Sequence, residues 1–156
     1  MTQETLNESS TVFIFLINLG ATMAMVGAIL IVQIVHYPLF SRVGAEYFRA
    51  YEAAHTNAIT LVVMPLMLAE LGTAFLLALQ PPRGVPSLAV WIGLVLVGVT
   101  WLSTAFIQVP LHGRLSAGFD LSAHQALVTT NWIRTVAWSL RGVLVLWMAW
   151  RLWAVR

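Results

Sequence analysis

Four histidines are the side chains of this sequence best suited to binding a metal ion or haem. His36, His55, His112 and His124 each lie where a long apolar stretch begins or ends. Imidazole binds zinc, copper, iron and haem iron. The chain has no cysteine, which excludes thiolate metal sites, cysteine-ligated iron–sulfur clusters and the attachment motif of c-type haem.

We predict that His36, His55 and His112 bind a metal ion or haem, with His124 as a further metal ligand. The metal would be iron, copper or zinc. The alternative is that the histidines are simply solvated at a membrane surface. Three carboxylates from the same ends of the apolar stretches could be ligands or hydrogen-bond acceptors: Glu46, Glu52 and Asp120.

The last apolar stretch carries a polar face. Asn131, Arg134, Trp138 and Arg141 are three, four and three residues apart, so they share one side of a helix. Counted from the starts of their apolar stretches, Arg141 and Glu70 lie at a similar depth. Charges inside lipid are almost always paired or turned toward a cavity. We therefore predict a Glu70–Arg141 ion pair in the interior, either as a structural clamp or as part of the function.

Asn131 and Arg134 are our candidate catalytic residues. They lie one to two helical turns below the histidines, where they would orient a substrate in a pocket that opens to the histidine end. Arginine suits an anionic oxygen because its planar fork donates two hydrogen bonds. The Glu70–Arg141 pair would form the floor. Hydroxyl and aromatic side chains would form the walls: Thr100, Trp101, Ser103, Thr104, Phe106 and Trp138. Such a cavity suits an aromatic or quinone-like molecule.

These side chains must be positioned by helices that cross a membrane. Hydrophobic residues make up 60% of the chain and charged residues 9%, whereas a soluble domain carries about a quarter charged residues. A membrane core of ~30 Å takes about 20 helical residues. Four apolar stretches reach that length, over about residues 12–35, 56–79, 87–109 and 128–150. We predict an all-α integral membrane four-helix bundle that forms one transmembrane domain over residues 1–156.

The two longer connections are expected to differ. Residues 40–54 are predicted to form an amphipathic helix that lies on the membrane surface and runs into the second span, because Val43, Tyr47 and Tyr51 recur at helical spacing. Residues 111–127 contain Gly and Ser, and we expect a looser loop there. Four spans would place both termini on one side of the membrane. Arginines are balanced between the two sides, so the positive-inside rule gives no orientation.

One segment of the fourth stretch resembles a family signature. Residues 130–135 read Thr-Asn-Trp-Ile-Arg-Thr. This segment is similar to the closing Asn-x-x-Arg-Thr signature of the anthrone oxygenase-like family of small four-span bacterial and fungal membrane proteins. The match rests mainly on Asn131 and Arg134, while length and helix layout agree over most of the chain. The resemblance implies oxygenation of an aromatic compound within the membrane. We expect a multi-pass protein of the bacterial inner membrane.

Three functions are compatible with these residues. The first is a membrane oxidoreductase or oxygenase-like enzyme that acts on a hydrophobic, aromatic or quinone-like molecule at a His-rich metal or haem site. The second is a non-catalytic subunit or assembly factor of a larger membrane complex. The third is a small-solute or proton carrier with Glu70 as its titrating group. Expected partners are the lipid bilayer and a hydrophobic small molecule, with no nucleic acid. A homo-oligomer or a larger membrane complex is a further expected partner. The small residues Gly20, Ala24 and Ala28 form a stripe suited to close helix contact.

Overall fold

The chain forms four long helical arms. The computed structural model describes residues 3–154, and the side chains of residues 8–154, and this part of the chain contains no strand. The first arm comprises α1 (Gln3–Ile31), the π-helix η1 (Val32–His36), α2 (Tyr37–Leu39) and the 3₁₀-helix η2 (Phe40–Arg42). The second arm is α3 (Ala45–Leu79). The third comprises α4 (Ser87–Ser103), the π-helix η3 (Thr104–Gln108) and α5 (Val109–Leu115), and the fourth is α6 (Leu121–Ala154).

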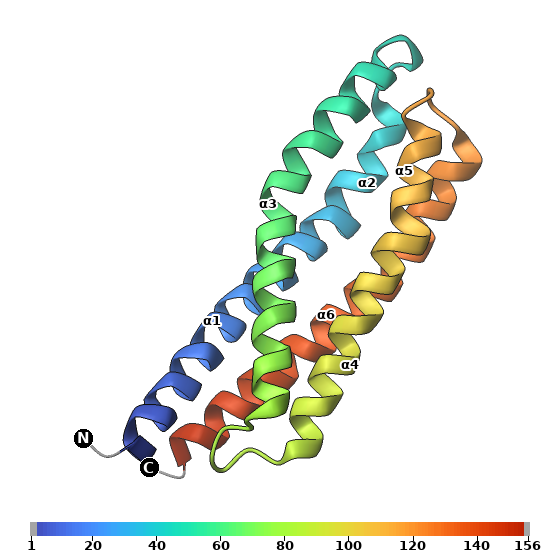
Figure 1. The fold of residues 1–156 in the computed structure, drawn as a ribbon. Coiled ribbons are helices and arrows are strands. Elements are labelled where there is room, and N and C mark those ends of the chain that lie inside the picture. The colour runs from blue at the N-terminus through green and yellow to red at the C-terminus, as the bar shows by residue number, and fades with distance from the viewer. Residues whose placement is uncertain (1–2, 155–156) are drawn as a thin grey trace.

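The arms form an elongated bundle in which successive arms run in opposite directions (Figure 1). α1 packs against α3 and α6, and α4 packs against the same two helices. Both termini lie at one end, which we call the terminal end. The opposite end, which we call the loop end, carries the connections at residues 43–44 and 116–120. Each arm therefore has neighbours on two sides and an outward face.

Three arms have the length and apolar composition to cross a membrane. Within the described residues these are Glu8–Arg42, Ala45–Leu79 and Ser87–Leu115. Large apolar side chains on their outward faces are exposed, such as Leu61 at 78% and Phe106 at 73%. Apolar surface spread over all sides of a helical bundle is suited to contact with lipid. The chain is therefore a helical protein of membrane type with three apolar candidate spans.

The amphipathic helix predicted at residues 40–54 runs into the second arm as expected, but its apolar face packs inside the bundle. Only Val43 and Gly44 interrupt the helices there, and residues 45–54 are the first turns of α3. Phe48 and Glu52 are fully buried because these turns pack against the first arm and the third arm. The amphipathic pattern thus reflects one face turned into the bundle instead of one face laid on a membrane.

The second connection is also shorter than predicted. Helix α5 continues to Leu115 and α6 begins at Leu121, which leaves only residues 116–120 between them. Asp120 caps α6, because its carboxylate accepts hydrogen bonds from the backbone N–H groups of Ser122 and Ala123. Backbone and side-chain hydrogen bonds from Ala123 and Ser122, together with Arg114, hold the pKa of Asp120 well below its usual range. The bundle therefore extends beyond the predicted spans at the loop end.

Two π-helical turns interrupt the first and third arms at corresponding places. The N–H of Tyr37 donates to the carbonyl of Val32, and the N–H of Val109 donates to that of Thr104. Each donor directly precedes a proline, at positions 38 and 110. Proline lacks an N–H and clashes with the carbonyl four residues before it, and a wider turn relieves that clash. Such turns often occur at functional sites.

A polar layer separates two apolar clusters in the core. The cluster toward the loop end contains Met25, Ile29 and Trp138, and the cluster toward the terminal end contains Phe15 and Met148. Along α3 and α6, the charged residues of the layer lie in sequence between the two clusters. This polar layer forms the base on which the candidate site rests.

Candidate functional site

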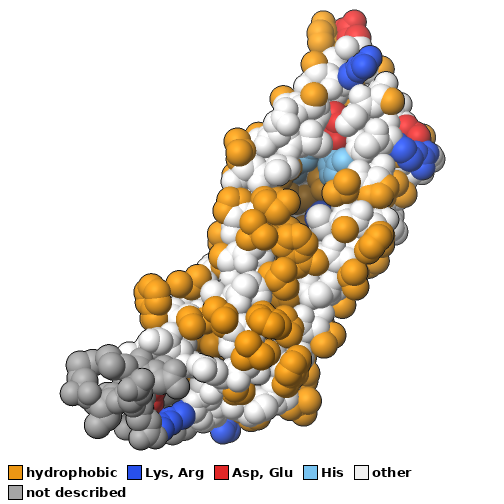
Figure 2. Space-filling view, viewed as in Figure 1, with side chains coloured by type: hydrophobic (Ala, Val, Ile, Leu, Met, Phe, Trp, Pro, Cys, Tyr) orange, Lys and Arg blue, Asp and Glu red, His pale blue; other side chains and the backbone are white. Residues whose placement is uncertain are grey.

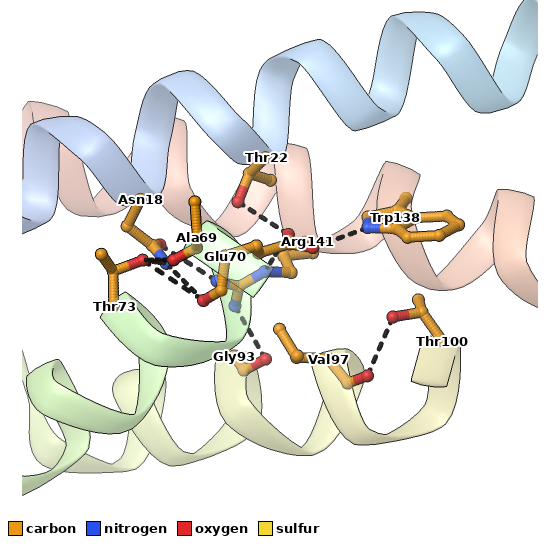
Figure 3. A network of polar contacts seen from close by, with 10 residues as sticks. All are labelled: Asn18, Thr22, Ala69, Glu70, Thr73, Gly93, Val97, Thr100, Trp138 and Arg141. Atoms are coloured by element: carbon orange, nitrogen blue, oxygen red, sulfur yellow. Dashed lines mark hydrogen bonds and ion pairs between the residues drawn. The ribbon is translucent and has the colours of Figure 1, made fainter. Parts of the chain in front are cut away.

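The polar layer contains the ion pair that the sequence predicts. Arg141 Nε lies 2.7 Å from Glu70 Oε1 (Figure 3). Glu70 also accepts hydrogen bonds from Thr22 at 2.8 Å and from the indole N–H of Trp138 at 2.9 Å. Arg141 donates further to the carbonyl of Gly93 and to Asn18 Oδ1, at 2.7 and 3.0 Å.

This layer joins all four arms. Thr22 and Asn18 belong to α1, Glu70 to α3, Gly93 to α4 and Arg141 to α6. Both carboxylate oxygens of Glu70 have hydrogen-bond partners, and the side chain is buried. An opposite charge and several hydrogen-bond donors therefore surround the buried carboxylate, as a buried charge requires. The arrangement is that of a structural clamp.

A cavity of about 380 Å³ lies on the loop-end side of this layer, and Trp138 is shared between the two. Apolar side chains line most of it: Met25, Ile29, Val32, Ile59, Val63 and Met67. Four of the polar lining residues are joined by hydrogen bonds, namely Tyr37, Thr104, His112 and Arg134, and the other polar residues of the lining are Thr56, Thr60, Gln108 and Ser116. Figure 2 shows a hollow between α3 and α5 with histidine side chains inside it. The site is therefore an apolar chamber with one polar region.

A chain of hydrogen bonds runs through the polar region. Arg134 Nη2 donates to Tyr37 Oη at 3.2 Å, and Tyr37 Oη lies 2.8 Å from His112 Nε2. His112 Nδ1 lies 2.5 Å from Glu52 Oε1. The four residues come from four different arms. With Nδ1–H donated to the carboxylate, the free Nε2 of His112 can accept the phenolic proton of Tyr37.

Charge lies at the two ends of this chain. Glu52 is fully buried, and its ion-pair partner in the described residues is His112. Arg134 is also buried, and no carboxylate of the described residues lies within ion-pair distance of it. The cation is thus left beside the cavity without a direct counter-ion. An anionic oxygen in the cavity would be stabilised there, because a nearby opposite charge favours the ionised form.

Asn131 fixes the position of Arg134. Its Oδ1 accepts hydrogen bonds from Nε of Arg134, at 2.8 Å, and from Nη2. Its Nδ2 donates to Gln33 Oε1 at 2.8 Å, and Gln33 in turn donates to the carbonyl of Val128. Asn131 does not line the cavity. Asn131 therefore contacts Arg134 and not the cavity, and its predicted catalytic role stays a prediction.

Arg134 keeps one donor for a ligand. A guanidinium group has five N–H donors. Four are used, because Asn131 accepts two, Tyr37 one and Thr104 one, the last from Nη1 at 3.2 Å. The remaining Nη1 hydrogen has no partner in the described part of the chain. Since Arg134 lines the cavity, this donor is suited to an oxygen of a bound molecule.

Three of the four histidines come together at the loop end. His36 Nε2 lies 2.8 Å from His55 Nδ1, and the rings of His55 and His112 have centroids 5.5 Å apart. His124 is separate: its Nε2 donates to the backbone carbonyl of Tyr37 at 2.8 Å. It holds two arms together and does not join the other three.

The arrangement gives no support to the predicted metal or haem site. Within the described residues, no group of three or more His, Asp or Glu side chains is placed to hold a metal ion. Both His36 Nε2 and His112 Nδ1 are engaged by other side chains of the cluster. Two buried atoms of this cluster, His55 Nε2 and Glu52 Oε2, have no hydrogen-bond partner.

The predicted pocket walls are partly wrong. Trp138 and Thr104 line the cavity, but Phe106 points outward and Trp101 packs in the core without reaching it. Thr100 and Ser103 do not line it either, because their hydroxyls donate to the carbonyl of Val97 and to Gln108 within the third arm.

Sequence reasoning missed Tyr37, whereas Glu52 was expected as a ligand or a hydrogen-bond acceptor and does lie at hydrogen-bond distance from His112. Glu52 and His55 are three residues apart on α3, a Glu-x-x-His spacing that places both on one helix face. That spacing was the available signal for both residues. For Tyr37, the signal was the following proline, which marks the helix distortion.

Comparisons of the chain with protein-family models, with curated proteins and with solved structures find no match. The resemblance of residues 130–135 to the anthrone oxygenase-like signature therefore gains no support, and the functional argument rests on the geometry of the site.

Proposed function

We propose that all four arms cross the membrane. The fourth arm, α6, is the one whose composition is least apolar, since it carries three arginines. Two of these, Arg134 and Arg141, are buried inside the bundle. Its outward face is apolar, with Ile133, Val143 and Leu146 exposed. A helix with its polar side turned inward can face lipid on the other side. The two termini at one end of the bundle fit an even number of crossings.

We propose further that the protein is a membrane enzyme that binds a hydrophobic, aromatic or quinone-like molecule and transfers a proton at one of its oxygens. The observation that carries this proposal is the Arg134–Tyr37–His112–Glu52 hydrogen-bond chain at the polar part of an otherwise apolar cavity. Apolar cavities with a few convergent polar groups are the usual form of small-molecule sites.

The proton would move in two linked steps. A hydroxyl of the bound molecule gives its proton to Tyr37 Oη, while the phenolic proton of Tyr37 passes to His112 Nε2. The products are a substrate oxyanion beside the Arg134 guanidinium and an imidazolium ion paired with the Glu52 carboxylate. Both new charges thus form next to an existing opposite charge, which is how preorganised sites lower the cost of charge separation. The reverse sequence returns a proton to the oxyanion.

This step relates directly to the oxidoreductase function expected from the sequence. A phenolate gives up electrons more readily than a phenol, so deprotonation would prepare an aromatic substrate for oxidation. The electron acceptor would be a separate component. Proton transfer is the part of the chemistry that the residues of this chain would carry out themselves, and it is testable without knowing the natural substrate.

An alkylated 4-nitrophenol is a suitable probe because its neutral and ionised forms absorb at different wavelengths. With purified protein in mild detergent, we expect binding to shift the ionisation equilibrium of the dye toward the phenolate about tenfold. Arg134→Gln should abolish the shift, because the cation is lost. Tyr37→Phe should reduce it, because the proton can no longer reach His112.

Arg151→Gln is the matched control, since Arg151 lies on the same helix near the terminal end and contacts the backbone of the 80–86 turn. It should leave the shift unchanged. An equal shift in the wild-type protein and in Arg134→Gln would refute the proposed proton transfer, and so would a dye that binds without any shift.

A further inference from the structure

The cavity is closed toward the loop end. No residue of segments 38–55 and 117–133 lines it. Instead, aromatic rings from these segments pack together above it, with Phe48 in edge contact with Phe40 and with Phe119. Phe40 and Phe48 are fully buried. The pocket expected to open at the histidine end therefore does not open there.

The cavity opens sideways, between α3 and α5. The lining residues that are also exposed are Thr60 on α3, Val109 and Gly113 on α5, and Ser116 directly after α5. The hollow in Figure 2 lies between the same two helices. Both helices belong to candidate membrane spans. The opening, which we call the portal, therefore faces the side of the bundle that lipid would cover.

The depth of the portal fits an amphipathic ligand. Thr60 lies 19 residues from Leu79, the terminal-end residue of α3, which is about 29 Å along a helix. A hydrocarbon core of ~30 Å measured from that end would reach just to the portal. Large apolar side chains flank it on the lipid side, including Leu61 and Phe106. A polar head could thus enter the cavity while an apolar chain stays in lipid.

Gly113 is an exposed residue at the mouth of the portal. It lies inside α5, where glycine costs about 1 kcal/mol relative to alanine. It does not have the positive φ that would require glycine. A Cβ added there would meet no atom within 4 Å, so close packing does not require glycine either. The consequence of its missing side chain is open space at the mouth of the cavity.

We propose that the ligand is a lipid-soluble molecule with an oxygen-bearing head and an apolar chain, and that it enters sideways from the bilayer past Gly113. This inference rests on the proposed function for the identity of the head. The cavity of about 380 Å³ is near the small end of ligand sites, which span roughly 300–1,000 Å³. It accommodates a head of one or two rings, and a longer chain must remain in the portal.

Gly113→Phe tests the portal, with Gly98→Phe as its matched control. Gly98 lies on the same arm, also has no atom within 4 Å of an added Cβ, and does not line the cavity. The probe is a fluorinated 4-nitrophenol with an octyl chain, added to protein in lipid nanodiscs and followed by ¹⁹F NMR. This measurement gives the bound fraction, the exchange rate and the ionisation state separately.

We expect Gly113→Phe to slow exchange of the probe at least tenfold or to abolish the bound signal, while Gly98→Phe stays within twofold of wild type. The octyl and methyl forms of the probe should bind from the bilayer with affinities within threefold, because the chain remains in lipid. Unchanged exchange in Gly113→Phe would overturn the portal, and loss of binding for the octyl form alone would overturn the protruding chain.

The two proposals fail in different ways. Normal exchange in Gly113→Phe, together with an ionisation shift that depends on Arg134, would leave the proton transfer intact and remove the portal. A bound signal that is blocked by Gly113→Phe but shows no ionisation would keep the portal and remove the proton transfer. No bound signal in the wild-type protein would overturn both.

Discussion

Gly93→Ala is the substitution for which the structure gives the most specific prediction. A Cβ on Gly93 would lie 2.8 Å from Arg141 Nη1, which is closer than real Cβ contacts. Nη1 is the atom that donates to the Gly93 carbonyl at 2.7 Å. The end of an arginine could normally move aside. Here it is held, because Nε is bonded to Glu70 and Nη2 to Asn18.

The expected cost follows from two opposing effects. Displacing Nη1 weakens a buried hydrogen bond from a charged donor, which is worth about 1.5–3 kcal/mol. Alanine in place of glycine in a helix returns up to about 1 kcal/mol. The net result is a destabilisation of about 0.5–2 kcal/mol. Gly98 lies on the same helix with open space around it, so Gly98→Ala should gain only the stabilisation from the higher helix propensity of alanine. The two variants should therefore differ by about 1.5–3 kcal/mol.

Equilibrium unfolding in mixed micelles with a rising fraction of SDS measures this difference through tryptophan fluorescence. The same pair is then compared in a Glu70→Gln, Arg141→Met background, where no guanidinium meets the new methyl group. In that background, Gly93→Ala and Gly98→Ala should change the free energy of unfolding by the same amount. If Gly93→Ala is as stable as Gly98→Ala in the native background, the argument that Arg141 is held in place is refuted.

Two further predictions follow from the same description. Glu70→Gln and Arg141→Gln should each destabilise the protein by about 3–5 kcal/mol, because each leaves one buried charge unpaired. In the same SDS titration, the double variant should lose much less stability than the sum of the two single losses. Additive losses would contradict a structural clamp. The pKa of Asp120 is lower in the folded protein than in the unfolded chain, where it is about 4. The ionised carboxylate therefore stabilises the folded state above about pH 4, and this contribution is lost as the pH falls further. The Tm difference between wild type and Asp120→Asn should therefore be largest above about pH 5 and shrink below about pH 4, and a constant difference would contradict the cap.

The sequence predicts the helices and the ion pair because both follow from one-dimensional counts. Apolar runs of about 20 residues mark the spans, and equal depth in parallel helices brings Glu70 to Arg141. The same counting places His36, His55 and His112 at one end, where they do converge. Counting residue positions does not show which hydrogen bonds each histidine ring makes. That depends on which neighbour reaches each nitrogen.

The errors at the loop end have one physical cause. An amphipathic pattern in residues 40–54 is compatible with a helix on a membrane surface or with a helix packed in a bundle. The burial of Phe48 and Glu52 shows that this helix packs in the bundle. Phe48 is covered by aromatic rings of other segments, which its own sequence does not reveal. The sideways opening was missed for the same reason, since the ring cluster closes the end that the sequence left open.

The two π-helical turns change the direction in which the side chains beyond them point. A π turn takes one residue more than an α turn, which shifts the helical phase of everything beyond it by about 100°. The first and third arms carry this shift at matching places, before Pro38 and Pro110. Their loop-end halves are therefore turned together relative to their terminal-end halves. Side chains of the two arms on the loop-end side of these turns therefore keep a common orientation, and Tyr37 and His112, whose Oη and Nε2 atoms lie 2.8 Å apart, belong to these loop-end halves.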